Sequence, residues 1–368
     1  MKIKFTDFIS EYKSQKKSFH KSLDVVGKKG QYILGDELKV FENNVKKFLK
    51  VKYVIGVGNW TEGMGLVCKA LDLKKDDEII TVSNSFIATC GAIAYYGCKP
   101  VLADVGKDLN IDCDSILKKI TRKTKAIMPV HLSGIPAQID MIKKICKKKK
   151  LYFIEDAAHA FGAKFKNKFI GTLGDVGIFS LHPRKNFHVL GDGGLITTNN
   201  KQLFNKISLL RNHGLKNRDT TLIWGTNSRL DNFQASIANN MLKTINKINK
   251  KHLIIAEYYN ANLKNFVQIP IYDKKLVVPT FHQYIIRTKF RDKLKKFLKS
   301  HGIETAIHYP KPIHKQKAYI KEFGKIKLLN TEKYSGQILS LPIHNWIKPS
   351  DLKYIVDTIS LFFKNIKI

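Results

Sequence analysis

Two segments about thirty residues apart carry side chains that can act on one substrate. In Ser180-Leu-His-Pro-Arg-Lys-Asn186, Lys185 follows the end of an apolar stretch and precedes a glycine-rich turn. In Phe153-Ile-Glu-Asp-Ala-Ala-His159, Asp156 ends another apolar stretch. Because ligands of open α/β sheets bind beyond the carboxyl ends of the strands, we expect Lys185 and Asp156 to face one crevice.

A lysine and an acid together suit pyridoxal phosphate chemistry. The lysine forms a Schiff base with the cofactor, and the acid keeps the pyridine nitrogen protonated so that the ring can accept electrons. The chain has 58 lysines, so one lysine read alone is a surface residue, and Asp156 read alone is equally a helix cap. Taken together, they predict Lys185 and Asp156 as catalytic residues, with no metal ion required.

A third segment, Ile55-Gly-Val-Gly-Asn-Trp-Thr-Glu-Gly63, suits a phosphate group. It follows an apolar stretch and opens a helix at Thr61 or Glu62, where backbone N–H groups converge. It is not a dinucleotide fingerprint, because Thr61 stands where the third glycine belongs. Phosphate binding and simple helix capping explain this segment about equally well.

Short apolar stretches separated by helical segments predict an α/β fold with a parallel sheet. We expect seven strands: Tyr53–Val57, Glu78–Val82, Pro100–Asp104, Ala126–Val130, Tyr152–Glu155, Val176–Ser180 and Gly194–Thr198. From residue 241 to 263 the apolar spacing predicts one long helix that bridges two lobes. Residues 1–245 are then a large cofactor domain with the N-terminal segment, and residues 246–368 a smaller α+β C-terminal domain.

Composition excludes several classes of protein. The 368 residues hold 65 Lys+Arg against 30 Asp+Glu, a net charge of +35, but only seven cations are arginine and the lysines are spread along the chain. Proteins that recognise bases in the grooves of DNA favour arginine over lysine for these contacts, so we expect no nucleic-acid partner. Five cysteines without CxxC spacing indicate a reducing compartment, and no apolar stretch has membrane-spanning length. We expect a cytoplasmic protein without a membrane partner.

Several further motifs resemble those of the DegT-type (DegT/DnrJ/StrS) sugar aminotransferases, and they cover nearly the whole chain. Beside the Lys185 and Asp156 segments, the resemblance rests on Gly58-Asn-Trp-Thr61, Ser83-Asn-Ser-Phe-Ile-Ala-Thr89, Pro129-Val-His-Leu-Ser-Gly134, Arg211-Asn-His-Gly214, Asn227-Ser-Arg-Leu-Asp-Asn-Phe-Gln-Ala235, His308-Tyr-Pro310, His314 and Leu341-Pro-Ile-His344.

The resemblance implies a fold type I pyridoxal phosphate enzyme, a homodimer with active sites at the interface. By similarity Lys185 bonds the cofactor, Asp156 pairs with its ring nitrogen and His159 contacts its phenolic oxygen. Phe86 matches the aromatic that stacks on the ring, although an ordinary core role stays open. Thr61 and Ser180 match ligands of the cofactor phosphate, and Glu62 lies at the same helix start as Thr61. Asn227 matches a phosphate contact that the partner subunit donates, although a role as an ordinary turn residue stays open for it.

The implied reaction moves an amino group from an amino acid, by similarity L-glutamate, to a nucleotide-linked keto-hexose, with pyridoxamine phosphate as the intermediate form. The product is an amino sugar for polysaccharide or lipopolysaccharide. A dehydratase branch of the same family has His in place of Lys185, which favours transamination here. The alternatives are such a dehydratase and a non-catalytic cofactor-binding regulator.

Four residues are candidates for substrate contact: His182, His308, Tyr309 and Trp60. A core or interface role is at least as suitable for each. Trp60 departs from the Asn-Gly-Thr pattern that is common in the family, and filling a hydrophobic gap is the favoured role for it. Gly63 and Gly65 in the following helix predict that another segment packs closely there.

Overall fold

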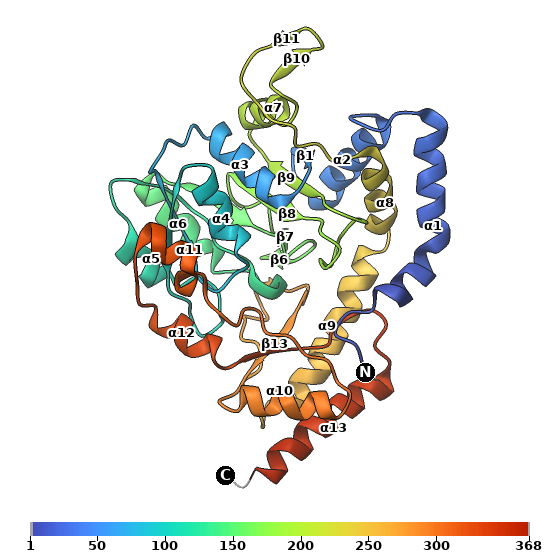
Figure 1. Cartoon of the computed structure of the whole chain (residues 1–368), viewed down its shortest axis with the longest axis vertical. Helices are drawn as coiled ribbons and strands as arrows, with labels where there is room; N and C mark the ends of the chain where they lie inside the picture. The colour runs from blue at the N-terminus through green and yellow to red at the C-terminus, as the bar shows by residue number, and fades with distance from the viewer. Residues whose placement is uncertain (1–2, 367–368) are drawn as a thin grey trace.

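The computed structural model describes residues 3–366, so residues 1–2 and 367–368 of the two predicted domains lie outside it. A seven-stranded sheet in the order β1-β9-β8-β5-β4-β2-β3 forms its centre (Figure 1). The strands are β1 (Tyr53–Val57), β2 (Glu78–Val82), β3 (Lys99–Ala103), β4 (Thr124–Ile127), β5 (Tyr152–Asp156), β8 (Val176–Ser180) and β9 (Gly194–Thr198). All neighbours are parallel except β9, which is antiparallel to β1 and β8. The predicted α/β fold with a mostly parallel seven-stranded sheet is confirmed.

Both faces of the sheet are buried, which explains the continuous apolar stretches of its strands. Ile79 and Ile80 are fully buried, yet they belong to different core clusters on opposite faces. Seven helices precede the strands or alternate with them: α1 (Phe8–Lys29), α2 (Asp36–Leu49), α3 (Trp60–Ala70), α4 (Ala88–Tyr95), α5 (Cys113–Lys119), α6 (Ile139–Lys149) and α7 (Lys201–Leu210).

Several predicted boundaries were wrong. β3 is shifted by one residue from Pro100–Asp104, and β5 extends one residue beyond Glu155 to Asp156. The two larger differences are in β4 and the long helix. Strand β4 ends at Ile127 rather than Val130, because Pro129 has no N–H to continue a ladder. The helix expected from Met241 to Leu263 begins only at Ile245. Met241 and Leu242 instead end the preceding helix α8 (Asn232–Leu242), and a two-residue break separates it from α9 (Ile245–Leu263). The break leaves the apolar spacing intact, so spacing alone did not reveal it.

The remaining elements lie around this body. They are the small strands β6 (Lys164–Phe165), β7 (Lys168–Phe169) and β12 (Val277–Val278), the hairpin β10 (Leu215–Asn217) and β11 (Thr220–Thr221), the pair β13 (Tyr284–Arg287) and β14 (Ile338–Leu341), and the helices α10 (Arg291–Ser300), α11 (Lys317–Phe323), α12 (Leu329–Ser335) and α13 (Pro349–Asn365). The β10–β11 hairpin projects beyond α7, at the end of the molecule opposite α10 and α13 (Figure 1).

The C-terminal segment packs back on the sheet edge. The carboxylate of Asp104, which follows β3, accepts hydrogen bonds from the N–H groups of Asn330 (2.9 Å) and Thr331 (2.8 Å) at the start of α12. Ile313 N–H donates to the carbonyl of Ser83, which follows β2 (3.0 Å). These contacts join residues on both sides of position 245, and the domain division there stays a prediction.

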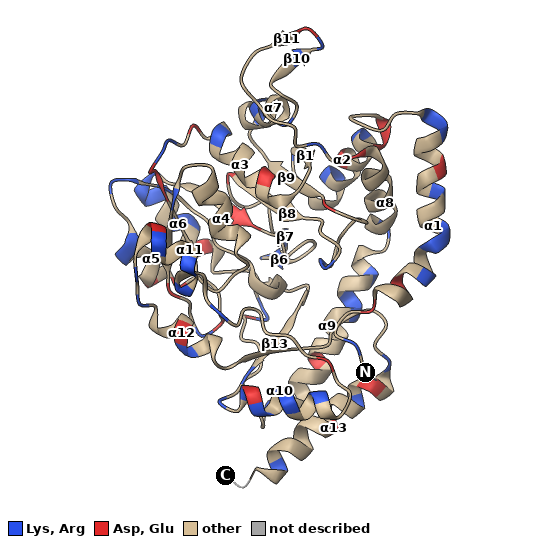
Figure 2. Cartoon of the chain, viewed as in Figure 1, with Lys and Arg blue, Asp and Glu red and all other residues tan. Residues whose placement is uncertain are grey.

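The charged residues and the cysteines are distributed over the molecule in different ways. Figure 2 shows Lys and Arg spread over many helices and loops of this view, without one dominant cluster. All five cysteines are buried and unpaired, as expected of packing residues. Among residues 3–366, no helix combines the length and apolar character needed to cross a bilayer.

Candidate active site

A cavity of about 1440 Å³ lies at the carboxyl ends of β5 and β8 and the start of α3. Of the twelve residues singled out from the sequence, it brings together eleven: Trp60, Thr61, Glu62, Phe86, Asp156, His159, Ser180, His182, Lys185, His308 and Tyr309. Asn227 is exposed, lies outside this cavity and pairs with Asn212 in an isolated β-bridge. Its predicted contact with the partner's cofactor stays a prediction.

Lys185 lies on a tightly bonded loop after β8. Its N–H donates to the carbonyl of His182 (2.8 Å), and its own carbonyl lies 2.9 Å from Nδ1 of His188. The next residues, Asn186 and Phe187, are buried and anchor the loop in the core. Burial lowers the pKa of the Lys185 amine to about 8, and the carboxylate of Asp156 partly opposes this shift.

Asp156 is the last residue of β5 and is 2 % exposed. Its carboxylate accepts hydrogen bonds from the N–H of Ala158 (3.2 Å) and the hydroxyl of Thr89 (3.2 Å). Burial raises its pKa to about 6, although the Ala158 bond, Lys185 and Thr89 all favour the charged form. The acid therefore still ionises at neutral pH although it is buried.

His159 is 3 % exposed, and its protonation state follows from its contacts. The N–H of Ser133 donates to Nδ1 of His159 (3.3 Å), so the ring hydrogen is on Nε2. Burial, together with the charge of Lys185, lowers the pKa of His159 well below its usual value. The ring is neutral at physiological pH, with Nε2 as its hydrogen-bond donor.

The start of α3 forms another wall. The side-chain oxygen of Asn59 caps the helix by accepting from the N–H of Glu62 (2.9 Å). The Glu62 amide is thereby occupied, and its carboxylate folds back over Gly58, where a Cβ would lie 2.6 Å from Oε2. The amides of Trp60 and Thr61 precede the first helical hydrogen bonds and, with the exposed Thr61 hydroxyl, suit an anion.

Trp60 borders the cavity but belongs mainly to the core. It is 6 % exposed and packs in the cluster beneath α3, and its indole N–H has no partner among residues 3–366. The close packing expected at Gly65 is present, because a Cβ there would lie 2.0 Å from the ring of Tyr96.

Aromatic rings line the side of the cavity near residue 309. Phe86 is 55 % exposed, and its ring centroid lies 6.1 Å from that of Tyr309. An open aromatic face at a cavity is unusual for a core residue, so Phe86 is not an ordinary core aromatic, and its contact with a cofactor ring stays a prediction. His308 stacks on Phe5 at 5.7 Å, and burial with the charges of Lys185 and Arg184 lowers its pKa to about 4.

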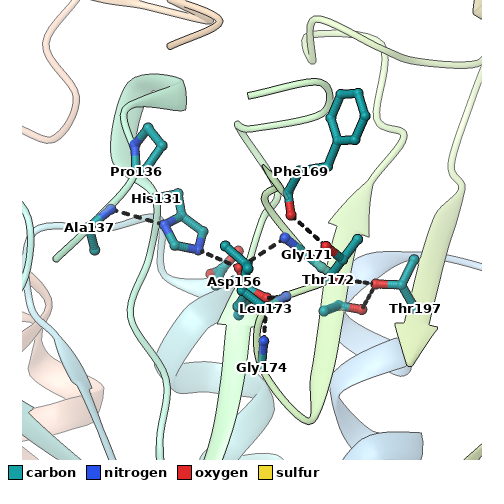
Figure 3. Close-up of polar contacts among 12 residues, drawn as sticks. His131, Pro136, Ala137, Asp156, Phe169, Gly171, Thr172, Leu173, Gly174 and Thr197 are labelled. Carbon is teal, nitrogen blue, oxygen red and sulfur yellow. Dashed lines mark hydrogen bonds and ion pairs between the residues drawn. The ribbon is translucent and has the colours of Figure 1, made fainter. Parts of the chain in front are cut away.

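The sequence analysis missed three groups of residues. Thr89 and Ser85 form a hydrogen-bonded pair behind Asp156, and their i, i+4 spacing at a helix start was the available signal. The N-terminal segment around Phe5 and Glu11 also lines the cavity. The buried polar contacts of His131, which Figure 3 shows with the turn at Gly171–Gly174, join the Pro129–Gly134 motif to Ala137 and Glu155, and no sequence signal indicated these pairings.

Comparisons with known proteins agree with this geometry. Residues 13–360 match the family described as the DegT/DnrJ/EryC1/StrS aminotransferase family. The dTDP-3-amino-3,6-dideoxy-alpha-D-galactopyranose transaminase of Aneurinibacillus thermoaerophilus is 37 % identical over 98 % of this chain and 99 % of its own length. A protein of Geobacillus stearothermophilus named "Pleiotropic regulatory protein" is 35 % identical over 99 % of this chain and 100 % of its own length.

A solved structure carries a cofactor. The crystal structure of NtdA from Bacillus subtilis with bound cofactor PMP is 29 % identical to this chain, with a TM-score of 0.90. The match covers 95 % of this chain and 82 % of the other.

Proposed function

The chain belongs to the DegT/DnrJ/EryC1/StrS aminotransferase family, and we propose that it uses pyridoxal phosphate to move an amino group from L-glutamate to a nucleotide-linked 3- or 4-keto hexose. The observation that carries the proposal is the pairing of Lys185 and Asp156 in one cavity, with pKa values displaced toward each other. Perturbed groups in a cleft are typical of catalytic sites. The named transaminase relative supports the sugar-nucleotide substrate.

The residues present fit the cofactor. Asp156 suits the ring nitrogen, His159 the phenolic oxygen and the exposed ring of Phe86 the pyridine face. The start of α3 at Thr61 and the hydroxyl of Ser180 suit the phosphate. When bound there, pyridoxal phosphate supplies a carbonyl that takes up the amino group and a protonated ring that draws electrons from the C–H bond being broken.

The protein's own groups manage the protons. Burial lowers the pKa of Lys185 to about 8. A shift of this size raises the neutral fraction of an amine near pH 7 by roughly two to three orders of magnitude. Neutral Nζ accepts the proton from the donor's α-carbon as a general base and returns a proton as a general acid. Asp156, ionised above about pH 6, holds a proton on the ring nitrogen through its carboxylate.

The proposal extends to where the enzyme acts in the cell, how its subunits assemble and which residues contact the sugar. We place the enzyme in the cytoplasm as a homodimer in which Asn227 reaches the partner's cavity, and its product in surface polysaccharide or lipopolysaccharide. His182, His308 and Tyr309 are the proposed sugar contacts, because they line the same cavity as Lys185. Trp60, at 6 % exposed, has the weakest case as a substrate contact.

Incubation with L-glutamate and a panel of nucleotide-linked 3-keto and 4-keto sugars tests the proposal. Mass and NMR analysis should find an amino sugar and 2-oxoglutarate. A deoxygenated sugar would identify a dehydratase instead, and turnover of no keto sugar would contradict the substrate class. The regulator alternative predicts bound cofactor without product, and nothing in a regulator requires the buried amine of Lys185.

A further inference from the structure

A second buried carboxylate, Glu155, adjoins Asp156 in β5. Successive side chains of a strand point to opposite faces, so Glu155 points away from the catalytic acid. It is fully buried and accepts hydrogen bonds from the N–H groups of Gly171 (2.9 Å), Leu173 (2.6 Å) and Gly174 (2.7 Å). These three donors hold the buried carboxylate, so Glu155 fixes the turn that leads into β8; Figure 3 labels Gly171, Leu173 and Gly174 of this turn.

His131 joins this carboxylate to the turn after β4. It is fully buried, and its Nε2 lies 3.3 Å from Oε2 of Glu155. Its Nδ1 accepts a hydrogen bond from the N–H of Ala137 (3.1 Å), so a neutral ring carries its hydrogen on Nε2, facing Glu155. The imidazole is held by a hydrogen bond at Nδ1, while Nε2 approaches Glu155 at ion-pair distance without a hydrogen bond of good geometry among residues 3–366.

The same turn holds two residues of the active site. The N–H of His131 donates to the carbonyl of Asp156 (3.1 Å). The N–H of Ser133 donates to Nδ1 of His159 (3.3 Å), from a residue in the left-handed region with φ 61°. The position of this turn therefore determines both where the backbone of Asp156 lies and which nitrogen of His159 keeps its hydrogen.

We propose that His131, anchored by Glu155, is a positioning residue that holds the turn at 131–134 and so keeps the hydrogen of His159 on Nε2. The inference rests on the proposed function, in which that hydrogen meets the cofactor's phenolic oxygen. A purely structural His–Glu pair stabilises the fold equally well but leaves the properties of the bound cofactor unchanged. This difference separates the two roles.

Two substitutions test the contacts of His131 separately. In His131→Asn the side-chain oxygen still accepts from Ala137, but the contact with Glu155 is lost. In His131→Gln the amide still reaches Glu155, but the acceptor for Ala137 is lost. His20→Asn, at an exposed position of α1, is the matched control.

Two measurements apply to each protein. Hydrogen exchange of the cofactor-free protein, followed by mass spectrometry, reports the turn. Losing the contact with the buried Glu155 carboxylate should speed exchange of residues 131–137 by roughly tenfold in His131→Asn. Absorbance titration with pyridoxal phosphate reports the state of His159. In His131→Asn the dissociation constant of the cofactor should rise by roughly tenfold, and the pH midpoint of the visible band should shift. The control His20→Asn should match the wild type in both measurements.

Three results would overturn the proposal. Unchanged exchange in His131→Asn would mean that His131 does not hold the turn. Faster exchange with unchanged affinity and midpoint would leave only a structural role. A wild-type protein that binds no pyridoxal phosphate would instead overturn the proposed function and this role with it. If His131→Asn does not fold, His131→Gln, which lacks the acceptor for Ala137, must likewise speed exchange of residues 131–137 and weaken cofactor binding, and unchanged values in it overturn the proposal.

Discussion

Two ionisable residues of the cavity, Asp156 and Lys185, are buried in a way that destabilises the folded protein. Asp156 and Lys185 are both buried, and burial moves the pKa of each toward neutrality. Neither has its charge fully compensated by the described residues. Burying these charges lowers the stability of the cofactor-free protein, and a bound ligand that pairs with both charges offsets this loss.

The cofactor-free protein should therefore gain stability from Asp156→Asn. The folded-state pKa of Asp156, about 6, lies above its ordinary value of 3.8, so its stabilising contribution is complete below pH 3.8 and is lost as pH rises through 6. Asn removes this loss. We expect the variant to unfold with about 1–3 kcal/mol more free energy at pH 8 and with roughly half that gain at pH 5, because the loss begins near pH 3.8.

Denaturant unfolding at both pH values measures this, and amino transfer should be lost in the same variant. A variant less stable than the wild type at pH 8 would mean that the Thr89 and Ala158 bonds outweigh the burial of the charge.

At the scale of elements, α3 combines a ligand-binding end with a closely packed interior. Its first turn borders the cavity, while Gly65 lies against the ring of Tyr96 from α4 and its continuation. Helix propensity alone favours alanine over glycine by about 1 kcal/mol. Packing predicts the opposite at this position, because the Cβ of an alanine would overlap the Tyr96 ring.

We expect Gly65→Ala to destabilise the protein by about 1–3 kcal/mol. Gly91 in α4 is the matched control, since no atom lies within 4 Å of a Cβ there. Gly91→Ala should stabilise by about 0.5–1 kcal/mol through propensity. Chemical denaturation of both variants checks the opposite signs, and a stabilising Gly65→Ala would show that Tyr96 moves aside freely.

Much of this arrangement was predictable from sequence, because buried parallel strands are continuous apolar stretches and catalytic groups follow their ends. The positions of Asp156 and Lys185 were inferred in this way. Contacts set by tertiary packing were not predictable: the Glu155–His131 pair joins residues 24 positions apart, and the break before Ile245 leaves the apolar spacing unchanged. The Glu62 amide was expected at the cavity, but the Asn59 cap occupies it.

For the whole molecule, the main open prediction is assembly. Asn227 is exposed and follows Trp224 and Thr226 in the segment after the projecting β10–β11 hairpin; Thr226 lines the cavity, whereas Asn227 does not. We propose that Asn227 contacts the cofactor in the partner's site, and this role is still a prediction. The +35 net charge is spread over the surface, so it has no evident role beyond attraction of an anionic sugar nucleotide.

Mixed dimers test whether Asn227 acts across the interface. Lys185→Ala and Asn227→Ala should each be inactive or strongly impaired alone. In a hybrid of the two, one site combines an intact Lys185 with an intact Asn227 from the partner, so activity should return. Hybrids without regained activity, despite a measured mass of twice 42.1 kDa, would place Asn227 outside the partner's site.

The central claim is that one lysine among 58 forms the covalent bond to the cofactor. Borohydride reduction of the holoenzyme, proteolysis and peptide mass spectrometry test it directly. We predict that the phosphopyridoxyl group is found on Lys185 alone, and that Lys185→Ala shows neither the label nor the borohydride-sensitive visible band. A label on another lysine, or a reducible band that survives in Lys185→Ala, would contradict the account.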